Sequence, residues 1–441
     1  MDWWQLDTVI YVLSLGHLMG NLIFQWNADE PSPTIDPKHR GLREALTAID
    51  WDFAGFNPSA RLAGIHALHW YPASFPPALV AAMLDLFASP GDVVLDPFCG
   101  SGVVPIEAWM RGMTAYGVDV NRFAVQLGQG KVDLLRSAKT EVCDQLIADY
   151  LAFRKNGQMS WRSASESSVC ERAEFGADAP RWFTLPVLRE LAILKQWVNG
   201  DSVSRKWQNV LRLTASSILH GKLSVVRNYH YTYIVDRSKV KAECRIPTDV
   251  PREFTEKLNA VFVDAALTRA QVDRAAHRRG ERAAPPHFEN AGAQDLARFI
   301  EPGSVDIAFT SPPYFGMNDY VRSQYLSWLI FQWPGYEIDL NRESGTRRLR
   351  TKANALEAYY GQMRTSFAAV EEMLRPGGFL ILVFGASQGG FVGDDDPVDR
   401  IKTIITGLRF RLFWSGTRRV RFRKINNTPY RSEVLWVFER T

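Results

Sequence analysis

The stretch PGDVVLDPFCGSGVVPIEAWMRGMTAYGVDVN (90–121) constrains the fold more than any other part of the chain. Its apolar run Val93–Leu95 ends at Asp96 and predicts a buried strand. A glycine-bearing turn follows and leads into a helical pattern closed by Gly112, after which TAYGVDV predicts a second strand ending at Asp119. A strand–turn–helix–strand unit of this kind predicts an α/β fold with a parallel sheet.

Apolar runs nearer the C-terminus repeat the strand pattern. SVDIAFTSPPY (304–314), GGFLILVFGAS (377–387) and EVLWVFER (433–440) each predict a later strand of the same sheet. The region between the two groups of strands carries charged helical patterns and predicts an insertion with its own helical core. In a chain of 441 residues we therefore expect an N-terminal segment (1–49), a discontinuous sheet domain (50–135 and 286–441) and an inserted helical domain (136–285).

The composition predicts a globular protein of the cytoplasm. Hydrophobic residues make up 46% of the chain and charged residues 23%, which excludes a disordered chain. The four cysteines show no CxxC spacing, so neither a disulfide framework nor a zinc site is indicated, and a reducing compartment fits. His66, His69 and His287 have no metal-ligand spacing either, and we expect no metal.

The N-terminal region contains an apolar stretch, TVIYVLSLGHLMGNLIFQW (8–26). It lacks the positively charged start of a signal peptide, and His17, Asn21 and Gln25 interrupt it. We expect a buried helix, or a helix and a strand, and no membrane span; a span is the lesser alternative. The polar, proline-bearing stretch 27–41 that follows predicts a linker.

The first glycine turn, DPFCGSG, has features of a ligand site. Gly100 and Gly102 remove side chains where a strand meets a helix, so that a ligand can approach the backbone. Asp119 ends the next strand, where a carboxylate can accept hydrogen bonds from ribose hydroxyls. No GxGxxG pattern or P-loop lysine is present, so an adenosine-bearing ligand without a pyrophosphate fits best. Taken alone, the two glycines favour a simple tight turn.

The second distinctive stretch is FTSPPYF (309–315), which follows an apolar strand. Its prolines fix the backbone and point the carbonyls that precede them in set directions, next to an aromatic ring. Such a rigid frame of acceptors suits a planar group that carries an NH₂, such as an adenine or cytosine taken out of its stack. A proline-rich turn that caps a strand is the structural alternative.

Together these stretches resemble a known family. VVLDPFCGSG and TSPPYF look like motifs I and IV of the S-adenosylmethionine-dependent DNA amino-methyltransferases, which methylate N4 of cytosine or N6 of adenine. IHALHWYPASFPPALVAAML (65–84) resembles their motif X, which lines the methionine end of the cofactor, and NAGAQDLARF (290–299) resembles the stretch whose acid lies near the cofactor adenine. The resemblance implies a Rossmann-like class I methyltransferase sheet and S-adenosylmethionine as cofactor.

The resemblance also implies the residues of the site. The cofactor would contact Tyr71, Ser74, Phe75, Asp96, Pro97, Phe98, Gly100, Ser101, Gly102, Asp119, Asn121, Asp295 and Thr310. The catalytic set would be Ser311, Pro312, Pro313 and Tyr314.

The chemistry of this catalytic set can be argued from the residues. An exocyclic aryl amine is a poor nucleophile, because its lone pair is delocalised into the ring. The Ser311 hydroxyl and the Pro312 carbonyl can accept its two N–H bonds, and these bonds strengthen as positive charge builds on nitrogen. Tyr314, with Phe315, would stack on the base. Serine is too weakly basic to remove a proton first, so we expect proton loss to follow methyl transfer.

Several functions remain open. A serine first residue in motif IV favours cytosine N4, and adenine N6 is the alternative. An RNA base N-methyltransferase and a cofactor-binding subunit without activity are less favoured. The chain contains no Pro-Cys pair for C5-cytosine methylation and no GxSxG of a hydrolase.

Basic side chains indicate where DNA would bind. The net charge is only +4, but arginines cluster in NRESGTRRLRTK (341–352) and WSGTRRVRFRKINN (414–427). We expect substrate contacts from Phe315, Tyr320, Arg322, Arg347, Arg348, Arg350, Arg419, Arg421 and Arg423. The insertion, with its polar segment 220–241, is the candidate for target recognition. The alternatives are solvated arginines and a segment that only holds the inserted helices together. Double-stranded DNA is the expected partner, and the resemblance leaves open a cognate restriction endonuclease or another defence component.

Overall fold

The computed structural model describes residues 37–51, 64–224, 249–279, 283–385, 397–421 and 430–441. The chain divides into two units, 1–49 and 50–441. Helix α2 (Pro37–Ala48) belongs to the first unit and begins inside the stretch predicted to be a linker, because proline is tolerated in the first turn of a helix. The apolar stretch 8–26 and residues 225–241 of the predicted recognition segment lie outside the described residues.

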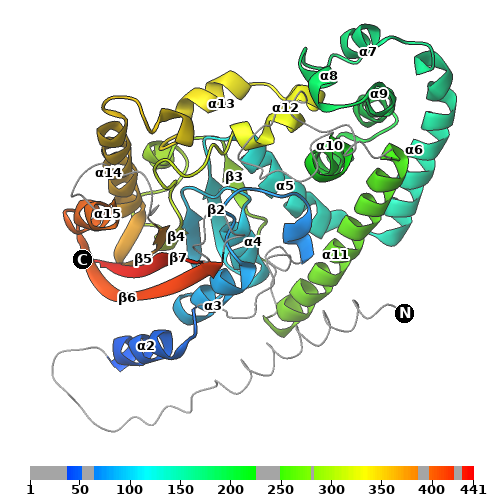
Figure 1. Cartoon of the computed structure of the whole chain (residues 1–441). Helices are drawn as coiled ribbons and strands as arrows, with labels where there is room; N and C mark the ends of the chain where they lie inside the picture. Colours follow the sequence, from blue (N-terminus) through cyan, green and yellow to red (C-terminus); the bar gives the residue numbers. More distant parts are fainter. Residues whose placement is uncertain (1–36, 52–63, 225–248, 280–282, 386–396, 422–429) are drawn as a thin grey trace. The chain divides into compact units, whose positions relative to one another are not determined.

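In the described part of the chain, seven strands form one sheet in the order β3-β2-β1-β4-β5-β7-β6 (Figure 1). The neighbours from β3 to β5 pair in parallel, and β7 lies antiparallel between β5 and β6. The strands are β1 (Val93–Asp96), β2 (Thr114–Val118), β3 (His287–Glu289), β4 (Val305–Thr310), β5 (Leu374–Gly385), β6 (Phe410–Arg421) and β7 (Tyr430–Arg440). The predicted Rossmann-like α/β fold is confirmed.

Both faces of the sheet are buried, which explains why its strands are continuous apolar runs rather than alternating ones. Leu380, Leu382 and Phe384 of β5 pack on one face with α14 (Ala355–Met373) and α15 (Pro397–Thr406). A second apolar cluster contains residues of α4 (Val103–Met110) and α5 (Arg122–Ser137), which follow β1 and β2 in the chain. Figure 1 shows α14 and α15 on the opposite side of the sheet from the helices that lie in the chain between β2 and β3.

The helical segment lies in the chain between β2 and β3 and, in space, beside the β3 edge of the sheet (Figure 1). Its core contains Tyr150, Trp197 and Phe254, whose rings lie 5.2 to 6.2 Å apart. The same apolar cluster includes residues of α5 and of α12 (Tyr325–Phe331). The segment consists of α6 (Thr140–Trp161), α7 (Glu166–Arg172), α8 (Ala179–Trp182), α9 (Leu185–Asn199), α10 (Arg205–Ile218), the π-helix η3 (Leu219–Leu223) and α11 (Val250–Arg279).

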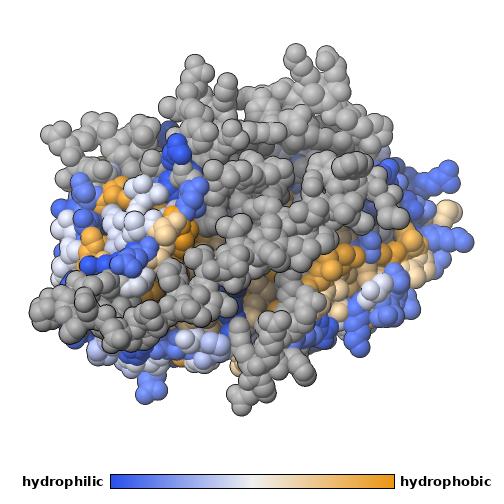
Figure 2. All heavy atoms as spheres, turned by 90° about the horizontal axis from the view of Figure 1, so that it is seen from below, coloured by the Kyte–Doolittle hydropathy of each residue, from blue (hydrophilic) through white to orange (hydrophobic). Residues whose placement is uncertain are grey.

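Exposed large apolar side chains gather mainly on this segment. They include Leu151 and Met159 of α6 and Val263 and Leu267 of α11. Seen from below, apolar atoms show between hydrophilic ones on the right-hand part of the surface (Figure 2). Among the described residues, no helix is long and apolar enough to cross a membrane, and no group of three acidic, histidine or cysteine side chains is placed to hold a metal.

Three glycines make room for the Phe288 ring of the edge strand β3: Gly102 before α4, Gly117 of β2 and Gly128 of α5. A Cβ atom on Gly128 of α5 would lie 2.5 Å from the Phe288 ring, and one on Gly117 would lie 2.8 Å from it. We predict that Gly128→Ala lowers the free energy of unfolding by about 1–3 kcal/mol, as overpacking does. Gly157→Ala in α6 is the matched control, because its Cβ would meet Ile193 at an ordinary 3.5 Å. Urea denaturation of both variants measures the effect, and equal stabilities would contradict this packing.

Candidate active site

A cavity of about 600 Å³ opens at the carboxyl ends of β1, β2 and β4, the end where open α/β sheets bind ligands. Its volume lies within the range of cofactor sites, about 300–1,000 Å³. Of the predicted cofactor contacts, Tyr71, Ser74, Phe75, Asp96, Pro97, Phe98, Gly100, Ser101, Asp119 and Asn121 line it. Ser311, Pro313 and Tyr320 line it too, so the glycine turn and the TSPPY stretch, two hundred residues apart in sequence, share one cavity.

A direct hydrogen bond joins these two stretches. The Thr310 hydroxyl at the end of β4 donates to Asp96 Oδ1 at 2.6 Å, and the Phe98 amide donates to the same oxygen at 3.1 Å. Both side chains are buried, and burial raises the pKa of the Asp96 carboxyl to about 7, although its hydrogen bonds oppose the shift. Thr310 itself does not line the cavity; it fixes β4 against the cofactor turn instead.

This buried carboxyl predicts a pH-dependent stability. Its pKa in the folded state is about 7 and its ordinary value is 3.8, so the ionised form disfavours folding increasingly as the pH rises between them. Asp96→Asn keeps an oxygen acceptor without the charge. We expect the variant to exceed the wild type in free energy of unfolding by on the order of 2 kcal/mol at pH 8, and to show no gain at pH 4. Denaturation at both pH values measures this, with Asp92→Asn, at a carboxylate that accepts from the Ser89 amide, as control.

Asp119 ties the end of β2 to the cofactor turn. Its carboxylate accepts from the Gly100 amide at 2.9 Å and from the Asn121 amide at 2.8 Å. Burial raises its pKa to about 6, and the two amide bonds partly offset that effect. A carboxylate at this place also has lone pairs available for the hydroxyls of a ribose.

The turn itself needs glycine for two reasons. Gly100 and Gly102 have φ of +48° and +75°, in the left-handed region that side chains disfavour. A Cβ on Gly100 would also approach the Tyr71 ring to 3.1 Å. That ring stacks on Tyr320 at 6.2 Å, and its hydroxyl accepts from the Asn121 amide group at 3.2 Å. Tyr71 and Tyr320 thereby form one aromatic wall of the cavity.

Two serine hydroxyls, those of Ser74 and Ser101, lie together in the cavity wall. Ser74 Oγ lies 2.9 Å from Ser101 Oγ and also donates to the Tyr71 carbonyl at 3.0 Å. Phe75 packs on Phe309 of β4 with ring centroids 5.3 Å apart. S-adenosylmethionine is a nucleoside that carries an amino acid, and it requires hydrogen-bond acceptors, hydroxyl groups, aromatic rings and close approach to the backbone. The cavity provides all of these, so the residues present fit that cofactor.

Besides Thr310, two predicted cofactor contacts do not line the cavity. The Asp295 carboxylate accepts from the Gly292 amide at 3.2 Å and closes the start of its own 3₁₀ turn, and the adjacent residues 291–294 line the cavity in its place. Gly102 does not line the cavity but lies against the Phe288 ring. The Asp295 side chain is held by a local turn that the motif pattern does not describe.

Tyr314 also differs from its predicted place. Its ring packs edge-on against Phe384 at 5.0 Å and does not line the cavity. Its hydroxyl accepts from Ser311 Oγ at 3.1 Å and faces the Val383 carbonyl at 3.3 Å and Glu433 Oε1 at 3.4 Å. Pro312 is buried, and the Pro313 carbonyl accepts from the Tyr359 hydroxyl at 2.8 Å, which holds the loop in place.

Glu343 is a site residue that the sequence did not indicate. It lines the cavity, is only 6% exposed, and accepts from the amides of Tyr320 and Val321. Burial raises its pKa to about 8, and the two amide bonds oppose this shift. Glu343 therefore fixes the chain that carries Tyr320. Only its neighbours in an arginine-rich loop could have drawn attention to it.

The predicted DNA-contacting arginines fall into different environments. Arg350 and Arg322 are exposed, and the Arg350 side chain lies beside Gly316, two residues after Tyr314. Arg348 instead turns inward, where its guanidinium donates to the Leu340 carbonyl. Arg342 lines the cavity.

The remaining predicted contacts complete this account. Arg347 is half-buried, Phe315 is buried against Tyr359, and Arg419 is exposed on β6. The side chain of Arg421 and all of Arg423 lie outside the described residues.

The sheet order, the glycine turn and the acid after β2 define a class I S-adenosylmethionine-dependent methyltransferase fold, with the cofactor predicted from the sequence. Residues 27–130 match a family described as DNA methylase. The match confirms, over this part of the chain, the predicted resemblance to DNA amino-methyltransferases. The matched residues end before motif IV.

The curated relatives include two Type II methyltransferases and one tRNA methyltransferase. The Type II methyltransferase M.MjaII of Methanocaldococcus jannaschii is 27% identical over 161 residues, which cover 36% of this chain and 29% of that protein. The Type II methyltransferase M.BsoBI of Geobacillus stearothermophilus is 21% identical over 331 residues, or 70% of this chain and 62% of that protein. A tRNA (guanine(10)-N2)-dimethyltransferase of Methanothermobacter thermautotrophicus is 42% identical over 53 residues, or 12% of this chain and 16% of that protein. The chain thus spans less than two thirds of each relative's length.

Proposed function

We propose that this protein transfers a methyl group from S-adenosylmethionine to the exocyclic N4 amine of a cytosine flipped out of double-stranded DNA. The observation that carries the proposal is the shared cavity: Ser311 and Pro313 line it together with Gly100 and Asp119. A methyl donor in the turn and an amine at the proline loop would therefore meet within one enclosed space, as transfer requires.

The hydrogen bonds of Ser311 support its role. Its hydroxyl proton is donated to Tyr314, so the lone pairs of Ser311 Oγ remain available to accept an N–H bond from the target amine. The Pro312 carbonyl would be the second acceptor. The nitrogen lone pair would attack the methyl carbon and the carbon–sulfur electron pair would stay on sulfur, which leaves S-adenosylhomocysteine. The extra proton on nitrogen would then pass to water.

The position of Tyr314 suggests a different role from stacking on the base. Because its hydroxyl accepts from Ser311 and faces Glu433, whose other oxygen accepts from Arg418 at 2.6 Å, Tyr314 orients the serine. Tyr320, which does line the cavity, is the better candidate for contact with the flipped base. This assignment makes Tyr314 a positioning residue and leaves Ser311 as the group that touches the substrate.

Incubation of the purified protein with labelled S-adenosylmethionine and mixed DNA and RNA, followed by nucleoside analysis, tests the proposal. Label in N4-methylcytosine supports it. Label in N6-methyladenine would show that DNA is the substrate but that the methylated base is adenine. Label confined to RNA would overturn the proposed substrate.

The Type II names of two relatives support a restriction-modification role with a cognate endonuclease. The helical segment between β2 and β3 is our candidate for target recognition.

Arg350 provides a test of the DNA-binding side. It is exposed beside the loop that carries Ser311, so it can neutralise a phosphate next to the flipped base. We predict that Arg350→Ala weakens DNA binding and reduces the slope of log K against log salt by about one, without changing cofactor affinity. Binding measured between low and moderate salt gives the slope. Arg375→Ala is the control: this exposed arginine at the start of β5 pairs with Asp306 at the start of β4, at the other end of the strands from the cavity, and its removal should leave the slope unchanged.

A further inference from the structure

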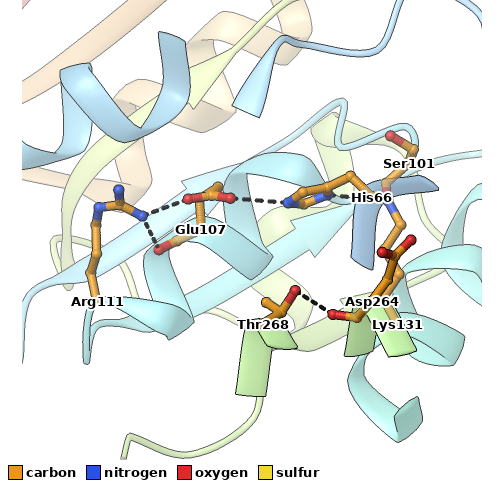
Figure 3. Close-up of polar contacts among 7 residues, drawn as sticks. All are labelled: His66, Ser101, Glu107, Arg111, Lys131, Asp264 and Thr268. Carbon is orange, nitrogen blue, oxygen red and sulfur yellow. Dashed lines mark hydrogen bonds and ion pairs between the residues drawn. The ribbon is translucent and has the colours of Figure 1, made fainter. Parts of the chain in front are cut away.

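A fully buried lysine lies behind the cofactor turn. Lys131 of α5 has no exposed surface, and its ammonium donates to the Ser101 carbonyl at 2.5 Å (Figure 3). Its second contact is His66 Nδ1 at 3.5 Å. Burying an ammonium group costs desolvation free energy unless a counter-ion pairs with it, and neither of these contacts is a carboxylate.

Among the described residues, the contacts of Lys131 lead to a carboxylate through a chain of side chains. His66 Nε2 lies 3.0 Å from Glu107 Oε1, and Glu107 Oε2 lies 2.6 Å from the Arg111 guanidinium (Figure 3). Burial lowers the pKa of His66, which favours the neutral ring, although the hydrogen bond to Glu107 opposes the shift. Since Nδ1 faces the ammonium, the ring hydrogen lies on Nε2 and is donated to Glu107. The lysine charge is thus separated from its counter-ion by the histidine ring, and the group next to it is the turn.

Ser101 connects this charge to the cavity. Its carbonyl binds Lys131, whereas its side chain lines the cavity and meets Ser74 Oγ at 2.9 Å. Directly after it, α4 begins at Val103, and the positive end of a helix of eight residues adds to the potential of the ammonium. An anionic group at the turn is therefore favoured by two independent features.

We propose that Lys131 is a positioning residue for the methyl donor: through the Ser101 carbonyl it holds the turn that receives the carboxylate of the cofactor's methionine half, and its charge strengthens that contact. The inference rests on the cofactor and not on the proposed DNA substrate. It assigns the carboxylate end of the ligand to the Ser74–Ser101 part of the cavity and the ribose to Asp119.

Binding of two ligands separates this role from general stability. S-adenosylhomocysteine carries the carboxylate, and methylthioadenosine lacks the whole amino-acid part. We expect Lys131→Met to weaken S-adenosylhomocysteine binding by about 10- to 100-fold and methylthioadenosine binding by less than about threefold in calorimetry at pH 6.5. Equal weakening of both ligands, or no change in either, would overturn the proposal.

Lys195→Met is the matched control. Lys195 is also buried, at 6% exposed, and also donates to a carbonyl, that of Glu174 at 2.9 Å, but it lies in the helical segment. Its removal should leave both affinities unchanged. If it reduced S-adenosylhomocysteine binding selectively, the effect of Lys131→Met could not be assigned to the turn.

The wild type offers a second test that needs no substitution. Burial lowers the pKa of Lys131 to about 7, and Cys99 and Glu107 oppose the shift. His66 and Arg111 are the other titratable groups of the chain of contacts that begins at the lysine. The charge is present below that pH and lost above it. The ratio of S-adenosylhomocysteine to methylthioadenosine affinity should therefore fall between pH 6.5 and 8.5, and a constant ratio would contradict the proposal.

Discussion

Ser311→Ala is expected to slow methyl transfer by about 100- to 1,000-fold and to leave cofactor affinity unchanged. The serine oxygen accepts an N–H bond that strengthens as charge develops on the amine, so its loss acts on the transition state rather than on ground-state binding. Single-turnover rates with saturating S-adenosylmethionine and DNA measure the effect. Equilibrium binding of the cofactor, measured on the same preparation, shows that the cavity is intact.

Two further variants sharpen this experiment. Tyr314→Phe removes only the hydroxyl that accepts from Ser311, so it should slow transfer less than Ser311→Ala while preserving the packing on Phe384. Ser344→Ala removes another serine hydroxyl of the cavity, one that donates to Gln362 at 2.5 Å, and should have little effect. A fully active Ser311→Ala protein would remove the chemical basis of the proposed mechanism.

Asp119→Ala has the second largest expected effect, a loss of about 100-fold or more in cofactor affinity. The substitution removes the acceptor for the ribose hydroxyls and, in addition, the anchor of the Gly100 amide. Because burial raises the pKa of Asp119 to about 6, cofactor affinity of the wild type should fall as the pH drops below that value, where the carboxyl is protonated. Calorimetry across pH 5 to 8 measures both.

Asp295→Ala is the matched control for this prediction. The sequence motif places Asp295 beside the cofactor adenine, but its carboxylate closes its own turn at the Gly292 amide. We expect its substitution to change affinity several-fold less than Asp119→Ala. The reverse order would restore the role that the motif implies for Asp295 and would remove the proposed ribose contact of Asp119.

The architecture could be predicted because most of its strands are recognisable in the sequence. Buried parallel strands are continuous apolar runs, and the rule that ligands bind at their carboxyl ends predicts a common site for Asp96 and Thr310; the structure pairs the two strands directly. The three-residue strand β3 (His287–Glu289) gives no such signal. Its position depends instead on Phe288 fitting over glycines of other elements.

The orientation of side chains was less accessible from sequence. A motif fixes that Tyr314 follows two prolines, but the hydroxyl direction depends on Val383 and Glu433, on two later strands. In the same way, Lys131 in sequence resembles any lysine of an amphipathic helix, and only the packing of three elements shows that it reaches the Ser101 carbonyl. Such contacts join residues that no local pattern relates.

The core shared by the helical segment with α5 and α12 has a consequence for engineering new specificities. A segment that leaves the sheet after β2 and returns at β3 invites exchange between relatives as a cassette. Here the transplanted segment would have to match the apolar surfaces of two helices that are not part of it. These helices are α5, which follows β2, and α12, which follows the proline loop. Chimeras that move only residues 140–279 should aggregate, whereas those that carry the facing sides of α5 and α12 with them should remain folded.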